Sequence, residues 1–233
     1  MQNDYQFDIS MRPDYSLLTV NLEPGQKIYA EPGSMASMST GIELKAGLKG
    51  GLFKSLGRAF GGESLVINTY TAHAAGEVAF APGPMGDLEH YRLESSSLIL
   101  QKGAFVAHGE GVDVSAKWGG AKGFFSGEGM VLLKASGTGD LFFSTYGAMV
   151  EIDVHEGYIV DTGYIVAFED TLDYSVRLVP GLGPGAKFKS LLFGGEGLVC
   201  EFKGRGKVWV QTRCVSAYLR WAHPYRPVER SSN

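Results

Sequence analysis

Apolar and polar residues alternate in short runs along most of the chain, and Gly-containing turns separate these runs. Leu18, Val20 and Leu22 follow a period of two, which is typical of a half-buried β-strand. Residues 5–10 alternate in the same way and predict an edge strand before it. A short helix is expected only over residues 215–221, where the Pro-containing residues 223–227 stop it. The pattern predicts an all-β protein.

A Gly-Glu motif occurs three times within this pattern, at residues 60–66, 125–131 and 193–199. Its glutamates, which are 65 and 68 residues apart, are Glu63, Glu128 and Glu196. After each glutamate, two β-rich runs are joined by a polar, Gly-bearing turn, which predicts a β-hairpin. Glycine suits such turns because a positive φ costs it very little free energy.

A second motif lies upstream of each copy, at residues 28–36, 98–106 and 158–166. Its glycines are Gly33, Gly103 and Gly163, and a stretch of variable length separates each from the next Gly-Glu motif. Two fixed motifs around a variable insert describe one structural unit with an adjustable loop. We predict internal repeats over about residues 27–90, 97–150 and 157–213, followed by a tail over 214–233.

A single unit of about 60 residues buries too little surface to be stable alone, whereas three units together bury enough. We therefore predict one domain over residues 1–233. Its expected fold is a β-sandwich or barrel in which the three repeats are related by pseudo-threefold symmetry. Paired hairpins of each repeat are expected to meet in a shared apolar interior.

Residues 44–60 are ambiguous, because leucines and Phe60 recur every four residues with lysine and arginine between them. A basic amphipathic helix on a membrane surface has this pattern. Four glycines oppose a helix, since each costs about 1 kcal/mol relative to alanine. The favoured interpretation is a loop that packs its apolar residues on the core, and the alternative is contact with a membrane or a partner. The residues proposed for such contact are Lys49, Leu52, Phe53, Lys54 and Arg58.

Composition and charge exclude several classes of protein. The chain has 233 residues and a net charge of −4, so it has no basic surplus to neutralise nucleic-acid phosphates. Cys200 and Cys214 lie among apolar residues and are expected to be buried thiols. The first residues lack the features of a signal peptide, and no apolar run approaches the ~20 residues of a membrane span. A cytoplasmic protein is expected.

Candidate chemistry is sparse in this sequence. The five histidines form no H-x-H or H-x-x-x-H pair, and no Gly-x-Ser-x-Gly nucleophile motif is present. We therefore expect no metal, no cofactor and no enzyme activity. The three glutamates are the candidate functional cluster, since pseudo-threefold symmetry would gather them around an axis to hold a cation or a partner. The favoured hypothesis is structural: each carboxylate accepts hydrogen bonds from turn N–H groups at the entry to its hairpin.

Several fragments resemble one known family. They are residues 60–63, 134–139, 160–163, 195–199 and 211–213, and they resemble the mitochondrial biogenesis (altered inheritance of mitochondria) family over about residues 5–213. The resemblance implies a β-rich fold like that of the tryptophan RNA-binding attenuation protein, and it implies no catalytic residues. Mitochondrial members are associated with inner-membrane organisation, but this chain lacks an Arg- and Ser-rich start like a transit peptide.

The expected function is that of a non-enzymatic β scaffold or interaction module. Such a module would be a homo-oligomer, because small β units bury their edges by association, and it would contact a protein or a membrane surface. Two alternatives remain open at this point. One is a small-ligand or metal-binding β-barrel, and the other is RNA binding by analogy with the attenuation protein.

Overall fold

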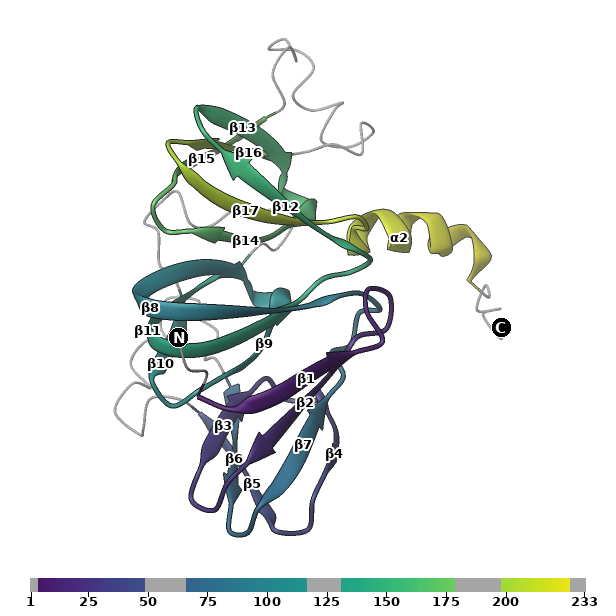
Figure 1. Ribbon diagram of the computed structural model, residues 1–233. Helices are drawn as coiled ribbons and strands as arrows, with labels where there is room; N and C mark the ends of the chain where they lie inside the picture. Colours follow the sequence, from purple (N-terminus) through teal and green to yellow (C-terminus); the bar gives the residue numbers. More distant parts are fainter. Residues whose placement is uncertain (1–3, 49–65, 117–130, 179–197, 227–233) are drawn as a thin grey trace.

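The computed structural model describes residues 4–48, 66–116, 131–178 and 198–226 (Figure 1). In chain order its strands are β1 (Gln6–Ser10), β2 (Leu17–Leu22), β3 (Lys27–Ala30), β4 (Met35–Met38), β5 (Ile42–Leu48), β6 (Val66–Ala72), β7 (Gly76–Phe80), β8 (Leu88–Gln101), β9 (Phe105–His108), β10 (Val112–Ala116), β11 (Leu132–Ser144), β12 (Met149–Val154), β13 (Gly157–Asp161), β14 (Ile165–Glu169), β15 (Asp173–Leu178), β16 (Leu198–Lys203) and β17 (Gly206–Gln211). The described part of the chain has one α-helix, α2 (Val215–Ala222). The prediction of an all-β protein with a short helix near residue 215 is confirmed.

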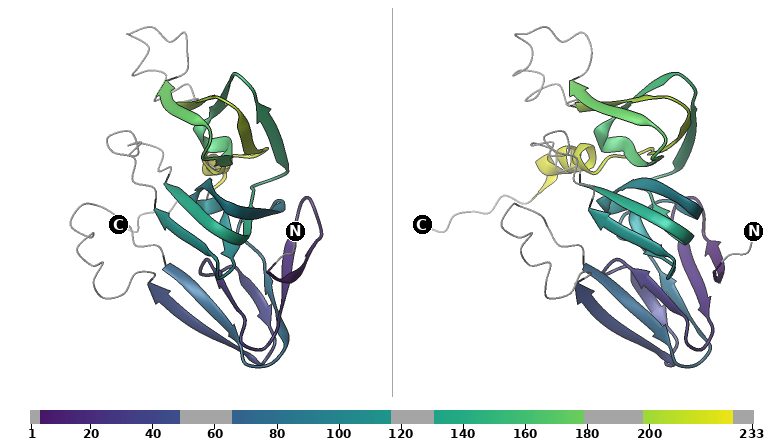
Figure 2. Two further views of the ribbon diagram at one scale, coloured as in Figure 1. Left: turned by 60° about the vertical axis from the view of Figure 1, so that its left-hand side comes forward. Right: turned by 90° about the vertical axis from the view of Figure 1, so that its left-hand side faces the viewer.

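The described strands form three sheets. In space the strands are arranged in three stacked tiers (Figures 1 and 2), which do not coincide with the sheets. We call β1–β7 the lower tier, β8–β11 the middle tier and β12–β17 the upper tier. One sheet, ordered β12-β17-β14-β8-β11-β9-β3-β6-β5 with β10 on β11, runs through all three tiers. The sheet β1-β2-β7-β4 completes the lower tier, and the sheet β13-β16-β15 completes the upper tier. Backbone hydrogen bonds therefore connect the tiers.

The two strands expected at the start of the chain are present. β1 is an end strand, as predicted, and it pairs antiparallel with β2. Leu18, Val20 and Leu22 on β2 are buried, because alternate side chains of a strand point to the same face. The period of two in the sequence thus identified the inward face of the lower tier.

The buried apolar residues form three clusters, each centred on one tier and extending into a neighbouring tier. Tyr70 and Phe80 pack in the lower core, Phe105 and Phe143 in the middle one, and Phe168 and Phe202 in the upper one. All six side chains are at most 1% exposed. Burying a large side chain of this kind contributes about 1.5–3 kcal/mol relative to leaving it in water. The interior is therefore divided among three clusters that cross the tier boundaries and is not one shared centre, contrary to the prediction.

The predicted hairpins after the Gly-Glu motifs are wrong. β6 pairs with β3 and β5, whereas β7 pairs with β2 and β4 in another sheet. In the same way β16 and β17 belong to different sheets. In the middle tier the expected turn lies inside the continuous strand β11, where the register shifts between Gly137 and Thr138. The glycine-bearing links thus carry the chain into another sheet in the lower and upper tiers, and in the middle tier the link lies within one strand of a single sheet.

Gly33, Gly103 and Gly163 each precede a strand with a β-bulge, and we call them the corner glycines. The strands are β4, β9 and β14, whose pairing with β7, β11 and β17 shifts by one residue. The extra residues are Ala36, Val106 and Val166, and each lies three positions after its corner glycine. A bulge bends its strand and increases the local twist. The same bend therefore occurs at the same place in all three tiers.

Two seams join neighbouring tiers, and we name them by position. In the lower seam β3 pairs antiparallel with β9, with Tyr29 opposite His108 and Ala30 opposite Ala107. In the upper seam β8 pairs antiparallel with β14, with Leu100 opposite Ala167 and Ile99 opposite Phe168. In each seam, the residue three positions before one corner glycine lies opposite the residue four positions after the following corner glycine. Both seams therefore have one register.

The structure describes only the first part of residues 44–60. Residues 44–48 belong to β5, which pairs with β6, so both the favoured loop interpretation and the helix hypothesis are wrong there. Leu44 is 37% exposed, which also contradicts its predicted place in the core. Within the described ranges, no helix has the length and apolarity to cross a membrane. Cys200 and Cys214 are free and buried, as predicted.

Candidate functional site

The residues that the sequence proposed for function lie outside the described part of the chain. These residues are Glu63, Glu128, Glu196, Lys49, Leu52, Phe53, Lys54 and Arg58. Both the glutamate cluster and the contact segment therefore stay predictions. Among the residues that are described, a cluster of polar side chains around the buried Asp140 and an adjoining hollow stand out.

Asp4, His90, Arg92 and Asp140 form a cluster that we call the N-terminal joint. His90 and Arg92 are two residues apart on β8 and so point to one face, and Asp140 on β11 is opposite Arg92. The Asp140 carboxylate has no exposed surface, and its Oδ1 atom lies 2.9 Å from His90 Nε2 and 3.0 Å from Arg92 Nη1. Arg92 Nη1 also donates to Asp4 Oδ1 over 2.7 Å. One guanidinium thus joins two carboxylates.

Backbone groups complete the joint. The N–H groups of Asp4 and Tyr5 donate to Asp140 Oδ2 over 2.7 and 3.3 Å. In return the Asp140 N–H donates to Asp4 Oδ2 over 3.0 Å. The segment before β1 is therefore fixed to β11 of the middle tier, and the lower and middle tiers gain a connection besides the lower seam.

The electrostatics of the joint favour charged Asp140. Burial by itself raises the pKa of this carboxyl group, but hydrogen bonds from His90, Arg92 and the Asp4 amide together hold the pKa below its ordinary value. The pKa of Arg92 is raised, first by its hydrogen bond to Asp4. A buried charge is stable only when it is paired and hydrogen-bonded. The joint meets that requirement.

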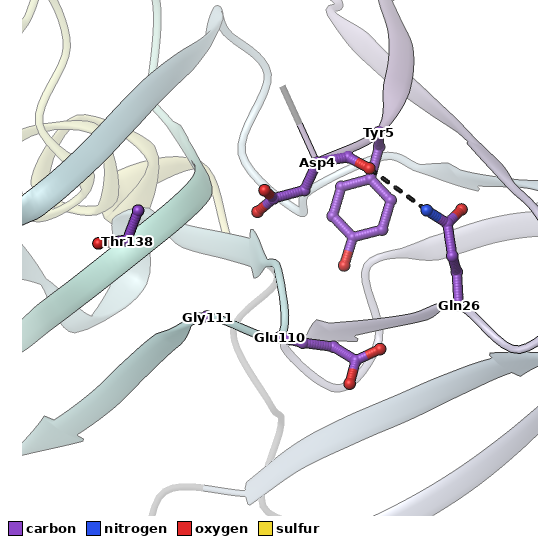
Figure 3. A pocket seen from close by; sticks show the side chains of 6 residues that line it. All are labelled: Asp4, Tyr5, Gln26, Glu110, Gly111 and Thr138. Carbon is purple, nitrogen blue, oxygen red and sulfur yellow. Dashed lines mark hydrogen bonds between the residues drawn. The ribbon is translucent and has the colours of Figure 1, made fainter. Parts of the chain in front are cut away.

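A small hollow of about 210 Å³ adjoins the joint (Figure 3). Its lining residues are Asp4, Tyr5, Gln26, Glu110, Gly111 and Thr138. Gln26 Nε2 donates to the backbone oxygen of Asp4 over 3.3 Å, which is the bond drawn in the figure. The Tyr5 hydroxyl donates to the backbone oxygen of Lys27, and burial raises the pKa of this phenol. Tyr5 is therefore a neutral anchor and not a base at physiological pH.

A second hollow of about 380 Å³ shares Glu110 and Gly111 with the first. Tyr29 and His108 lie on its other side, with their rings stacked. His108 is 1% exposed, and its Nδ1 atom lies 2.7 Å from the Gly109 oxygen. This histidine is thus enclosed in the lower seam, where it serves packing.

The chemistry of this region is that of a structural connection. The carboxylates of the joint are paired with Arg92 and accept hydrogen bonds from backbone amides, so they are held in one geometry. No group of three or more His, Cys, Asp or Glu side chains suited to a metal ion occurs in residues 4–48, 66–116, 131–178 and 198–226. The sequence analysis did not single out Asp140. Its position before Leu141, Phe142 and Phe143 was the available signal, because a charge in an apolar run needs a partner.

Fold and site together define an all-β protein of stacked tiers in which hydrogen bonds around the buried Asp140 join the lower tier to the middle tier. The chain belongs to the mitochondrial biogenesis AIM24 family, whose model matches residues 7–213. The resemblance found in the sequence is thereby confirmed.

Two relatives extend over nearly the whole chain. An uncharacterized protein of Streptococcus pyogenes serotype M6 is 28% identical over 247 aligned positions, which cover 100% of this chain and 95% of the relative. The crystal structure of a Streptococcus pyogenes protein from a structural genomics consortium is 25% identical and has a TM-score of 0.79. That likeness covers 95% of this chain and 100% of the other.

Proposed function

We propose that the protein is a non-enzymatic, homo-oligomeric β scaffold that docks on an anionic membrane surface. The observation that carries the scaffold part is the shared plan of the three tiers. In each tier the strand before the corner glycine pairs with the strand after the Gly-Glu motif, as in β3 with β6, β8 with β11 and β13 with β16. These pairings and the three bulges support three copies of one unit with a pseudo-threefold relation, as in a TRAP-like arrangement.

The helix α2 supports docking on a partner. None of its residues is buried, and it extends away from the tiers in Figure 1. Its exposed side chains include Tyr218 at 47%, Leu219 at 59% and Trp221 at 64%, and Tyr225 beyond it is 75% exposed. An exposed group of large apolar side chains is typical of an interaction site.

Charge favours an anionic membrane surface as the partner of α2. The sequence from Phe202 to Val228 contains no aspartate or glutamate, and Arg213, Arg220 and Arg226 lie within or beside the helix. Tryptophan and tyrosine prefer the membrane–water interface, and basic residues are attracted to anionic headgroups.

A vesicle experiment tests this docking. The full chain should sediment with phosphatidylcholine vesicles that contain phosphatidylserine and should stay in solution with phosphatidylcholine alone. Replacing Tyr218 and Trp221 with alanine should reduce the bound fraction at least tenfold, because their rings would no longer enter the interface. The control is Tyr15→Ala, which removes an aromatic ring that is 70% exposed elsewhere.

If the wild-type protein does not sediment with anionic vesicles at low salt, the membrane part of the proposal is contradicted. Equal binding by the Tyr218→Ala/Trp221→Ala variant removes the role of α2. In that case the sequence-based contact segment is tested next, by replacing Lys49, Lys54 and Arg58 with glutamate. Loss of binding in this second variant would assign docking to that segment.

A further inference from the structure

We infer that β13 of one copy pairs with β4 of a second copy, so that the seam between tiers is repeated between molecules. The inference rests on the proposed homo-oligomer and names the surface that builds it. Within the chain, the strand before a corner glycine pairs with the strand after the next corner glycine at both seams. The strand left over at the upper end is β13, and the strand left over at the lower end is β4.

Both strands have an open edge in the described part of the chain. β13 is an end strand of the sheet β13-β16-β15, and β4 is an end strand of the sheet β1-β2-β7-β4. An end strand has unpaired N–H and C=O groups that can receive a further strand. β13 and β4 lie in tiers at opposite ends of the stack in Figure 1, so a second copy is the natural partner for each.

An apolar side chain of β13 is exposed at a position where the corresponding side chain of β8 is buried. Ile99 of β8, four positions before its corner glycine, has no exposed surface in the upper seam. Ile159, the counterpart on β13, is 45% exposed, and so is its neighbour Tyr158. An isoleucine that is covered in one tier is therefore open to solvent in another.

The counterparts of β4 show the same contrast. His108 on β9 and Phe168 on β14 lie five positions after their corner glycines, and each is 1% exposed. Met38 occupies this position on β4 and is 38% exposed. Every residue of β9 is buried, whereas three of the four residues of β4 are exposed.

The shared register gives the contacts of the new seam. Val160 would lie opposite Ser37, and Ile159 would lie opposite Met38, in an antiparallel pair. The Ile159–Met38 pair then takes the place of Tyr29–His108 and Ile99–Phe168 at the existing seams. This pairing would cover two exposed apolar side chains at once.

Charge does not oppose this pairing. β4 carries no charged residue, and the one charged residue of β13 is Asp161. The Asp161 carboxylate already accepts the Gly163 N–H over 2.8 Å. Natural edge strands are commonly protected by several charges, whereas these two carry only Asp161 between them. Because β13 and β4 are different surfaces, the contact is head-to-tail and gives open chains or closed rings.

Cysteine cross-linking tests the register. Purified Met38→Cys and Ile159→Cys variants are mixed, oxidised mildly and analysed on a non-reducing gel. Opposed residues of an antiparallel pair have Cα atoms about 4.5–5.5 Å apart, which is within the range for a disulfide. A cross-linked dimer with one copy of each variant is expected. Mixing Met38→Cys with Val150→Cys, which is 44% exposed on the edge strand β12, should give at least tenfold less dimer.

Charge substitution tests the assembly itself by native mass spectrometry. Ile159→Lys and Met38→Lys should each block assembly, whereas a mixture of the two should form dimers, since each variant keeps one intact edge. Val150→Lys should assemble like the wild type. Circular dichroism should show that all variants keep the fold, because the replaced side chains are exposed.

The outcomes separate the inference from the proposed function. Wild-type assembly that survives both lysine substitutions overturns the inference and leaves the homo-oligomer intact. A monomeric wild type overturns both. A Met38→Cys/Ile159→Cys double variant that cross-links within one chain also overturns the inference, because the two edges would then meet inside a single molecule.

Discussion

The ring of Tyr29 lies flat against the ring of His108, with centroids 5.0 Å apart and planes 11° from parallel. The two residues belong to different tiers and meet in the lower seam. In the upper seam, the same two positions relative to the corner glycines are occupied by Ile99 and Phe168. A stacked aromatic pair and an aliphatic–aromatic pair thus serve one structural purpose, which is to close the space between two tiers.

Phe168 and Met38 each lie five positions after a corner glycine, but we expect replacement by alanine to change the free energy of unfolding by different amounts. Phe168→Ala should lower the free energy of unfolding by about 3–5 kcal/mol, because the ring is buried and lies 5.0 Å from Phe202. Met38→Ala, at the corresponding position on the open edge of β4, should cost less than about 0.5 kcal/mol in dilute protein. Urea unfolding at low protein concentration measures both. Similar costs would contradict the difference in burial between these positions.

The N-terminal joint predicts a large effect for Asp140→Asn. Removing the charge leaves Arg92 paired with Asp4 alone, and the loss of hydrogen bonds to a buried charged group costs about 1.5–3 kcal/mol. Asp14→Asn, at an exposed position, is the matched control and should be neutral. Thermal or urea unfolding at pH 7 measures both variants.

The dependence of stability on pH in the acid range tests the role of Asp140 a second time. Its pKa is lowered in the folded protein, so its contribution to stability is present above the ordinary value of 3.8 and is lost as the pH falls further. The difference between wild type and Asp140→Asn should therefore shrink at acid pH. A difference that stays constant down to pH 2 would show that charge is not its cause.

For Glu31 we expect stability to change with pH in the opposite direction to that expected for Asp140. Burial raises the pKa of this carboxyl group from 4.5 to about 7, so the folded state holds a proton that the unfolded state releases. Stability should therefore fall as the pH rises from about 4.5 to 7. Glu31→Gln should remove this loss and stabilise the protein at pH 8 by at most about 3 kcal/mol, at 1.36 kcal/mol per pKa unit.

Melting temperatures between pH 4.5 and 8 test this prediction. Glu77→Gln, at an exposed position of β7, should follow the wild-type curve and serves as the control. If Glu31→Gln and wild type lose stability in parallel, another group causes the pH dependence.

Two glycines predict opposite responses to alanine. A Cβ atom on Gly111 would lie 2.0 Å from the backbone oxygen of Thr138, so Gly111→Ala must displace β11 and should cost about 2 kcal/mol or more. A Cβ atom on Gly103 would meet nothing within 4 Å, and Gly103→Ala should be neutral or slightly stabilising. Unfolding curves of the two variants, recorded side by side, measure the difference. Equal destabilisation would contradict the tight contact at Gly111.

The corner glycines recur in the sequence, but the sequence does not show what constrains each of them. A positive φ was expected of the glycines in the turns after the Gly-Glu motifs, and Gly137, Gly139 and Gly204 have it. Among the corner glycines, φ is positive only at Gly33, where it is +88°. At Gly163 the constraint is space, because an added Cβ would lie 2.6 Å from Cys214 Sγ. Contacts between residues far apart in the chain do not appear in a local pattern. The same limit explains the failed hairpins, since a short polar link does not reveal which sheet its second strand joins.

Strand positions were predicted well where one face is buried. The alternation of Leu18, Val20 and Leu22 identified β2, because burial of one face imposes that period. Asp140 was missed, because its importance depends on Arg92 and His90 and on a backbone segment that precedes it by more than a hundred residues. The candidate glutamates and the contact segment remain predictions.

Native mass spectrometry of the full chain at a series of protein concentrations measures the self-association that the proposed scaffold requires. A homo-oligomeric scaffold predicts masses at multiples of 25.1 kDa that grow with concentration and fall back to the single mass in Ile159→Lys. A wild-type protein that shows only the 25.1 kDa species at every concentration would contradict the account.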